Sequence, residues 1–191
     1  MIFFTLYLTQ GGHTGQIPVI DDRGKPCYSI RGNLDNPNHT LYLIDLDGNE
    51  VGRLFNDGAG LIASYTIDII NHSLVHVKKI NSRATNLFYV TGLNYWINGS
   101  IKNGSYSFRS GLKKVASVKT EVHDHGAVLN CNILRPEDVP FILLISVLFT
   151  QWHVTPLELP DFLPLINSRR YSTNTNFFKL LLPYDHKNDH Q

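Results

Sequence analysis

A continuous apolar segment near the end of the chain limits the folds that the sequence can adopt. The segment runs from Phe141 to Phe149, and Ser146 alone interrupts it. Proline and acidic residues precede it over 136–140, and both suit the first turn of a helix, where N–H groups lack partners. A helix that is apolar on all sides must be buried on all sides. Because the segment is too short to span a bilayer, the rest of the protein must surround it.

The sequence before this segment alternates between apolar and polar residues, as half-buried strands do. The alternation is clear over 65–69, 75–78 and 129–133. A period of two places one set of side chains on an apolar face and the other set toward water. No stretch between these segments has the pattern of a crossover helix, so we expect neighbouring strands to be antiparallel.

Turn residues separate the strand-like segments at spacings that are typical of a sandwich or barrel. The pairs that favour tight hairpin turns are Asp47-Gly48, Asp57-Gly58, Asn98-Gly99 and Asn103-Gly104. A long antiparallel sheet followed by one wholly apolar helix predicts a mainly β fold, in which a closed antiparallel barrel surrounds the helix. A further buried strand in place of the helix is the alternative, because periodicity separates the two poorly over a short apolar run.

The length of 191 residues fits one domain with a core that needs neither disulfides nor metal. A formal net charge of +1 gives no strong case for nucleic acid as a partner. Cys27 and Cys131 fit no metal motif, and we expect two free thiols, which suits a reducing compartment. The N-terminus lacks the basic region and cleavage site of a signal peptide, and no apolar run reaches the ~20 residues of a membrane span. We therefore expect a cytoplasmic protein without a transmembrane segment.

Several hairpins, taken in order, resemble those of the LURP-one-related proteins, which include the bacterial YxjI-like group. The run from Leu41 to Gly52 is similar to the family's "LyDlnGnevg" hairpin. The segments that resemble the later hairpins and the terminal helix are 64–67 with 75–80, 88–90 with 96–99, 114–118, and about 136–151. The resemblance covers residues 1–151, although the first hairpin, with Gly11-Gly12-His13, is less basic than is usual in the family.

The resemblance implies a tubby-like fold, in which about twelve antiparallel strands form a closed barrel around a central hydrophobic helix. Relatives that share this fold include tubby, which binds phosphoinositides, and the phospholipid scramblases, which act at membranes. No lipid-contacting residue of those proteins can be matched here position by position. The segment 152–191 is longer than the tail of typical members, and we expect this C-terminal extension to pack on the barrel or to stay partly exposed.

The sequence carries no recognisable catalytic motif. It has no Gly-x-Ser-x-Gly elbow and no phosphate loop ending in Gly-Lys-Ser/Thr. His123-Asp124-His125 would need a third metal ligand from elsewhere and is typical of a polar turn. Asp45-x-Asp47-x-Asn49 begins like a calcium loop, but Glu50 occupies the position of the required Gly, which favours a hairpin turn. We therefore expect no enzyme activity, no metal and no cofactor, although a catalytic triad that forms only in space would leave no such signature.

Adjacent basic residues occur at Lys78-Lys79 and at Lys113-Lys114, in strand-like segments. Neighbouring residues of a strand point to opposite faces, so each pair should place at most one charge in a common outer patch and the other near a rim. One interpretation is ordinary solvated charge, which keeps sheets from aggregating. The functional interpretation makes these four lysines candidate contacts to anionic phospholipid headgroups, where each basic residue adds about 1 kcal/mol of binding free energy.

These observations lead to two main hypotheses for the function. The first is a non-catalytic tubby-like barrel that binds anionic phospholipid headgroups at a membrane surface. The alternative is a structural or protein-interaction module that uses the C-terminal extension, where Trp152, Phe177 and Phe178 are too apolar to remain in water. Salt-dependent binding to lipid distinguishes the first hypothesis from the second.

Overall fold

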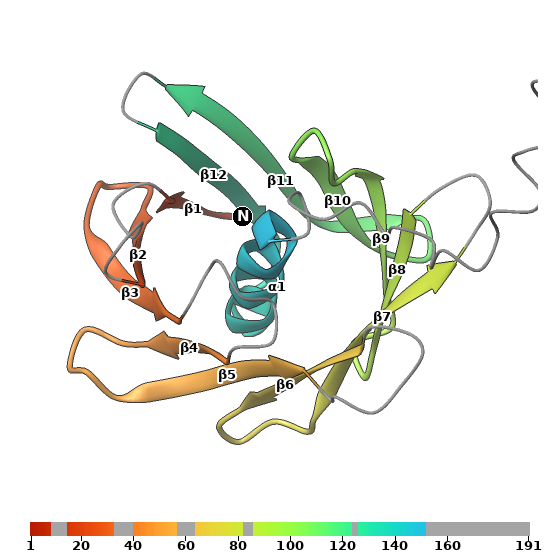
Figure 1. Cartoon of the computed structure of the whole chain (residues 1–191), viewed down its shortest axis with the longest axis horizontal. Helices are drawn as coiled ribbons and strands as arrows, with labels where there is room; N and C mark the ends of the chain where they lie inside the picture. Colours follow the sequence, from red (N-terminus) through yellow and green to blue (C-terminus); the bar gives the residue numbers. More distant parts are fainter. Residues whose placement is uncertain (9–14, 33–39, 57–63, 82–85, 124–125, 152–191) are drawn as a thin grey trace, which may run out of the picture. The chain divides into compact units, whose positions relative to one another are not determined.

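Twelve antiparallel strands close into a barrel around one helix in a computed structural model of the chain (Figure 1). The structure describes residues 1–8, 15–32, 40–56, 64–81, 86–123 and 126–151. The strands are β1 (Ile2–Tyr7), β2 (Gln16–Asp21), β3 (Pro26–Arg31), β4 (Leu41–Ile44), β5 (Glu50–Asn56), β6 (Ser64–Ile69), β7 (Val75–Asn81), β8 (Asn86–Thr91), β9 (Tyr95–Ser100), β10 (Ser105–Ser110), β11 (Lys113–His123) and β12 (Gly126–Ile133). A 3₁₀ turn, η2 (Pro136–Asp138), leads into the helix α1 (Val139–Gln151).

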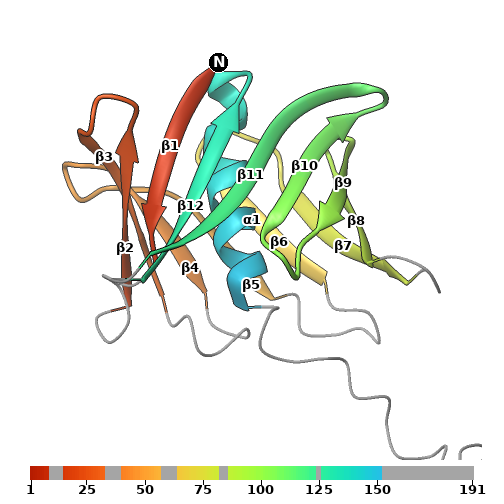
Figure 2. The same cartoon turned by 90° about the horizontal axis from the view of Figure 1, so that it is seen from above.

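Each strand pairs with its neighbours in sequence, and β1 closes the barrel by pairing with β12. Connections therefore alternate between the two ends of the barrel. Short turns at one end join β2 to β3, β4 to β5, β6 to β7, β8 to β9 and β10 to β11, at residues 22–25, 45–49, 70–74, 92–94 and 111–112. The N-terminus and the start of α1 lie at this same end, which we call the helix-entry rim (Figure 2).

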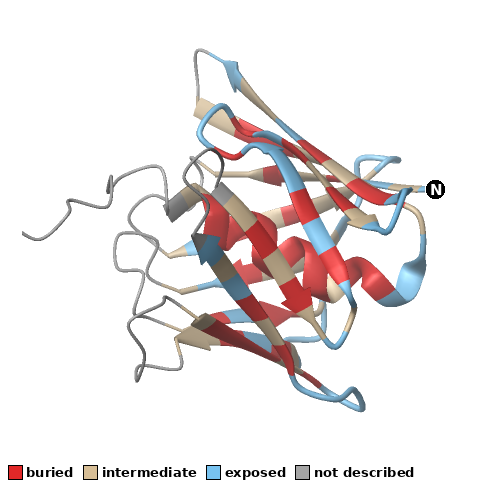
Figure 3. Ribbon diagram, turned by 90° about the vertical axis from the view of Figure 1, so that its right-hand side faces the viewer, coloured by how far each residue is buried: buried red, intermediate tan, exposed pale blue. Residues whose placement is uncertain are grey.

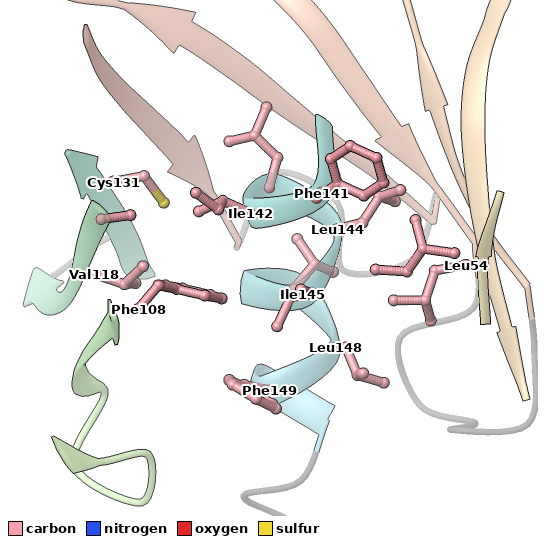
Figure 4. Close-up of a cluster of buried hydrophobic side chains, with 14 of the residues drawn as sticks. Leu54, Phe108, Val118, Cys131, Phe141, Ile142, Leu144, Ile145, Leu148 and Phe149 are labelled. Atoms are coloured by element: carbon pink, nitrogen blue, oxygen red, sulfur yellow. The ribbon is translucent and has the colours of Figure 1, made fainter. Parts of the chain in front are cut away.

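The helix α1 lies in the centre of the barrel, as the apolar segment predicts. Every residue from Phe141 to Phe149 is buried, including Ser146. The Ser146 hydroxyl donates a hydrogen bond to the carbonyl oxygen of Ile142 at 2.6 Å, which satisfies this polar group within the helix. Figure 4 shows helix side chains between Phe108 on one side and Leu54 on the other. The alternative of a further buried strand is therefore wrong.

The strands supply the other half of the core through alternate residues. Val75 and Val77 of β7 are buried, and so are Leu129, Cys131 and Ile133 of β12. Buried and exposed positions follow one another along the strands in Figure 3. This pattern confirms the predicted faces of β7 and β12 and leaves their intervening side chains on the outside of the barrel. Thr66 of β6 differs, because the alternation predicts that it faces water, whereas it is buried.

Both cysteines are free thiols, as predicted. Burial raises the pKa of Cys131 to about 12. Burial is also the main reason that the pKa of the half-buried Cys27 lies above its ordinary value, and the nearby charge of Asp21 adds to this effect. Since the thiolate is the reactive form, neither environment favours a reactive cysteine.

One predicted turn is wrong. Asn98-Gly99 lies within β9, whereas Asp47-Gly48 and Asn103-Gly104 do occupy turns. Gly99 has a φ of +125°, and a Cβ atom there would lie 2.6 Å from the carbonyl oxygen of Ser105. The glycine therefore permits a close approach of β9 and β10 and does not mark a turn.

Some predictions lie outside the described residues. Asp57-Gly58, Gly11-Gly12-His13, two residues of the His123-Asp124-His125 turn and the extension 152–191 are among them. In the part of the chain that is described, no helix has the length and apolar character needed to cross a membrane.

A buried polar cluster fixes the start of α1 to the barrel wall. The carboxylate of Asp138, which is 1% exposed, accepts hydrogen bonds from the Tyr95 hydroxyl at 2.9 Å and from Nε of Arg135 at 2.9 Å. Arg135 also donates to the Tyr95 hydroxyl. Burial and, to a lesser extent, the Asp138 carboxylate raise the pKa of Tyr95 to about 12. The cluster therefore joins the residues before the helix to β9 at the helix-entry rim.

Replacing Asp138 should destabilise the fold. We expect Asp138→Ala to lower the free energy of unfolding by about 2–3 kcal/mol, because it leaves the Tyr95 hydroxyl and Arg135 without their partner. The control is Glu137→Ala, which removes the same charge from an exposed side chain 3.5 Å from Arg135 and should cost less than about 1 kcal/mol. Urea unfolding followed by circular dichroism measures both, and equal losses would contradict this role for Asp138.

Candidate functional site

The register of strands β7 to β11 aligns basic and aromatic side chains in one row across the sheet. Lys78 pairs with Tyr89, and Tyr89 pairs with Trp96. Trp96 in turn pairs with Arg109, which pairs with Lys114. Directly paired residues of antiparallel strands point to the same face of the sheet. We call Lys78, Tyr89, Trp96, Arg109 and Lys114 the basic-aromatic row.

The row faces outward because the alternate residues of the same strands form the core. Lys78 and Lys114 are exposed, and Trp96 is 37% exposed. The buried residues that flank the row along these strands are Val77, Phe88, Val90, Tyr95, Ile97, Phe108 and Val115. The inward residues therefore fix the direction of the row, since a strand that turned it inward would expose core side chains.

A β-bulge brings Lys114 into the row. The pairing of β10 with β11 shifts between Phe108, which pairs with Ala116, and Arg109, which pairs with Lys114. Val115 is the extra residue, and it remains buried together with Ala116. A regular ladder would have placed Val115 opposite Arg109 on the outer face, so the bulge keeps valine inside and lysine outside.

The aromatic centre of the row is held in place by contacts on the barrel surface. The rings of Tyr89 and Trp96 lie 4.6 Å apart between centroids, with an interplanar angle of 42°. The Tyr89 hydroxyl donates a hydrogen bond to Oδ1 of Asn94 at 2.8 Å. Asn94 belongs to the β8–β9 turn and has a φ of 56°, a conformation that asparagine tolerates. The two rings therefore form an ordered platform between the basic residues.

The cations of the row keep their charge uncompensated within the described residues. Lys78, Arg109 and Lys114 form no ion pair with another described residue. Nη1 of Arg109 donates to the carbonyl oxygen of Leu112 at 3.1 Å, and this contact holds the guanidinium beside the β10–β11 turn. Neighbouring strands lie about 4.8 Å apart, so the row extends over roughly 19 Å from Lys78 to Lys114.

In a comparable row on the neighbouring wall, Arg53 is neutralised, whereas Arg31 forms no ion pair with another described residue. Arg31 pairs with Tyr42, Tyr42 with Arg53, and Arg53 with Asp68 across β3 to β6. Here Arg53 lies 3.1 Å from the Asp68 carboxylate and 3.9 Å from that of Glu50. The contrast shows that aromatic and basic residues alone do not distinguish the basic-aromatic row. Its distinction is three cations without a nearby carboxylate among the described residues.

The four predicted lysines divide between the row and its margins. Lys78 and Lys114 belong to the row. Lys79 pairs with the buried Phe88 on the inward side of β7 and is half-buried. Lys113 is exposed opposite Ser110, beside the β10–β11 turn. This division agrees with the expectation that each lysine pair contributes one charge to an outer surface.

Sequence reasoning missed Tyr89, Trp96 and Arg109. Their place in the row depends on strand register, which hydrophobic alternation alone does not supply. One signal was available for Arg109, because Gly111-Leu112 is a two-residue hairpin loop that sets the strands on either side in register. The bulge at Val115 carries no comparable signal in the sequence.

The calcium-loop candidate at Asp45 is accounted for by local structure. Oδ1 of Asp45 accepts hydrogen bonds from the backbone N–H groups of Asp47 at 3.0 Å and Asn49 at 2.8 Å. These hydrogen bonds, that of Asn49 most strongly, hold the pKa of Asp45 below its ordinary value. The segment is thus the predicted hairpin turn. Among the described residues, no three His, Cys, Asp or Glu side chains gather closely enough to hold a metal ion.

A shallow hollow of about 250 Å³ lies over β1, β12 and β11. Its lining includes Phe3, Thr5, Lys119 and Asn132. Lys119 is 3.1 Å from the carboxylate of Glu121, and Oδ1 of Asn132 is buried without a hydrogen-bond partner among the described residues. A single compensated charge beside neutral polar groups gives this hollow no acid–base pair.

The row should create a positive potential around Trp96. In a Trp152→Phe variant, where Trp96 is the remaining tryptophan, we expect iodide to quench fluorescence more strongly than caesium, each relative to a free tryptophan derivative. The difference should be roughly twofold, and both Arg109→Gln and added salt should reduce it. Equal relative quenching by the two ions would contradict an uncompensated positive surface.

The barrel is similar to one in a solved structure. The X-ray structure of a protein from Arabidopsis thaliana matches with a TM-score of 0.53 and 18% sequence identity, over 79% of this chain and 90% of that chain. No family model matches the chain, and no curated protein matches it. At this identity the likeness shows the fold alone. The closed twelve-stranded barrel with a buried helix is the architecture that the resemblance to the LURP-one-related proteins implies.

Proposed function

We propose that this protein is a non-catalytic barrel of the LURP-one-related family that binds anionic phospholipid headgroups at a cytoplasmic membrane surface. The basic-aromatic row is the proposed contact. The observation that carries the proposal is the placement of Lys78, Arg109 and Lys114 on one outer surface without an ion-pair partner among the described residues.

The chemistry of the cations suits phosphate groups that repeat over a surface. The planar guanidinium of Arg109 can donate two parallel hydrogen bonds to one phosphate, whereas the lysines act as point charges. A row of roughly 19 Å is longer than one headgroup and can contact several neighbouring lipids. At about 1 kcal/mol for each basic residue, three cations give weak binding that salt reduces.

The aromatic residues suit the same environment. Tyr89 and Trp96 each combine an apolar ring with a polar group, and side chains of this kind favour the boundary between lipid and water. Their stacked arrangement exposes part of Trp96 between the basic residues. The rings would therefore lie at the level of the headgroups that the cations contact.

Family membership and ligand class have different support. The order of the hairpins and the twelve-stranded barrel support the family, and relatives with this fold that act on lipids make a lipid the first ligand to test. Fold analogy alone does not establish a ligand. The sequence lacks recognisable catalytic motifs, which supports the proposal of a binding role.

Co-sedimentation with liposomes tests the proposal. We expect binding to phosphatidylcholine vesicles that contain phosphatidylserine or phosphoinositide, less binding at physiological than at low ionic strength, and none to phosphatidylcholine alone. Lys78→Glu combined with Lys114→Glu should weaken binding by at least about 2 kcal/mol, roughly thirtyfold, because attraction becomes repulsion.

The control variant carries the same change in net charge elsewhere. Lys25→Glu combined with Lys102→Glu alters exposed residues of the β2–β3 and β9–β10 turns, outside the row. It should bind nearly as well as the unmodified protein. Equal weakening by both variants would show attraction to net charge and would contradict a defined site. Absence of binding to every vesicle would contradict the lipid proposal and redirect attention to a protein partner of the extension.

A further inference from the structure

The turns of the helix-entry rim expose large apolar side chains. Leu112 of the β10–β11 turn is 96% exposed, Leu46 of the β4–β5 turn 69%, and Ile70 and Leu74 of the β6–β7 turn 59% and 54%. Met1 at the same end is 71% exposed. Single exposed apolar residues need no explanation, but five of them at the same rim of the barrel can together form an apolar surface that a partner could cover.

Acidic residues divide the turns of this rim into two unlike halves. The turns 70–74, 92–94 and 111–112, all within the described residues, contain no aspartate or glutamate, and Lys113 and Lys114 follow the last of them. The turns 22–25 and 45–49 contain Asp22, Asp45 and Asp47, and the first of them also carries Arg23 and Lys25. The half formed by 70–74, 92–94 and 111–112, which we call the acid-free half-rim, joins the strands that carry the basic-aromatic row.

The carboxylate closest in sequence to the acid-free half-rim is already compensated. Asp68, near the end of β6, lies 3.1 Å from Nη2 of Arg53. The carboxylates of Glu137 and Asp138, which precede α1 at the same rim, lie 3.5 Å and 2.9 Å from Nε of Arg135 and are compensated as well. Apolar tips and uncompensated cations thus occupy one continuous corner of the barrel, formed by the β7–β11 wall and its turns. This combination complements an anionic bilayer, which offers negative charge at its surface and apolar chains beneath.

We infer that the acid-free half-rim inserts its apolar tips into the membrane, with Leu112 as the leading side chain. The inference rests on the proposed lipid-binding function and adds that part of the protein enters the apolar layer of the bilayer. The ligand is a bilayer surface. The basic-aromatic row contacts the headgroups, and Leu112 contacts the apolar layer beneath them.

The β10–β11 turn has a conformation, a length and a hydrogen bond that favour such an insertion. Gly111 has a φ of +58°, as the first position of a tight two-residue hairpin loop of this kind requires. The loop is short, so little conformational freedom is lost when it binds. The carbonyl oxygen of Leu112 already accepts a hydrogen bond from Arg109, which lowers the cost of moving this polar group away from water.

Leu46 provides a matched comparison on the same rim. It is also an exposed leucine at the tip of a hairpin, but Asp45 and Asp47 flank it on either side. Negative charge next to the tip would be repelled from an anionic surface. The inference therefore predicts that Leu112 enters the bilayer and that Leu46 does not.

Environment-sensitive fluorescence at the two tips tests this prediction. Leu112→Cys and Leu46→Cys, each in a Cys27→Ser background, can be labelled with a nitrobenzoxadiazole probe, since Cys131 is buried. With vesicles of phosphatidylcholine and phosphatidylserine, the probe at 112 should shift to shorter wavelength and be quenched by lipids brominated on the acyl chain. The probe at 46 should keep its spectrum in water.

Unlabelled variants measure the contribution of each tip. Leu112→Ala should weaken co-sedimentation by about fivefold, because most of the leucine side chain no longer leaves water on binding. Leu46→Ala should change it by less than about twofold, since that side chain stays in water in both states. These expectations concern the full chain in its native fold, and circular dichroism verifies that both variants are folded.

The outcomes separate this inference from the proposed function. Binding to anionic vesicles with no spectral shift at 112, or binding that soluble glycerophosphoserine fully displaces, would overturn insertion and leave headgroup recognition intact. No binding to any vesicle would overturn both. The protein could instead self-associate in the absence of vesicles, and Leu112→Ala could abolish that self-association. This result would assign the half-rim to a second copy of the chain and would also overturn insertion.

Discussion

Burial of α1 is the interaction on which the rest of the structure depends. The helix has apolar residues on all its sides, and each residue from Phe141 to Phe149 is buried. An open sheet would cover one side of such a helix, whereas a closed barrel covers all of them. Closure also removes the free edges that a long antiparallel sheet would otherwise expose. The helix and the closed wall therefore require each other.

This requirement determines where a binding site can lie. In the described barrel the inward side chains of the strands form the core with α1, so its surface for a partner consists of the outward half of each strand and the described turns. On β7 to β11 the outward half includes the basic-aromatic row, and the turns of the same strands include Leu112. The inward residues fix the register, and the register brings Lys78 and Lys114 into line with Arg109. Packing of the inward residues thus determines which outward side chains lie side by side.

The sequence predicts those features that depend on composition within one element. The apolar run indicates the buried helix, and alternation indicates which residues of each strand face it. It also predicts that Lys78 and Lys79 face opposite sides, as they do. The row itself could not be predicted, because Tyr89, Trp96 and Arg109 are brought together by pairing between strands. The predicted turn at Asn98-Gly99 was wrong for a similar reason. The glycine permits the close approach of β10 and does not form a local bend.

The proposed membrane contact is the corner formed by the β7–β11 wall and its turns. Hydrogen exchange of the full chain, measured by mass spectrometry with and without phosphatidylserine-containing vesicles, tests it most directly. Exchange should slow in the turns 70–74, 92–94 and 111–112 and stay unchanged in the turns 22–25 and 45–49. Slower exchange in the turns 22–25 and 45–49, or equal slowing all round the rim, would contradict this orientation on the membrane.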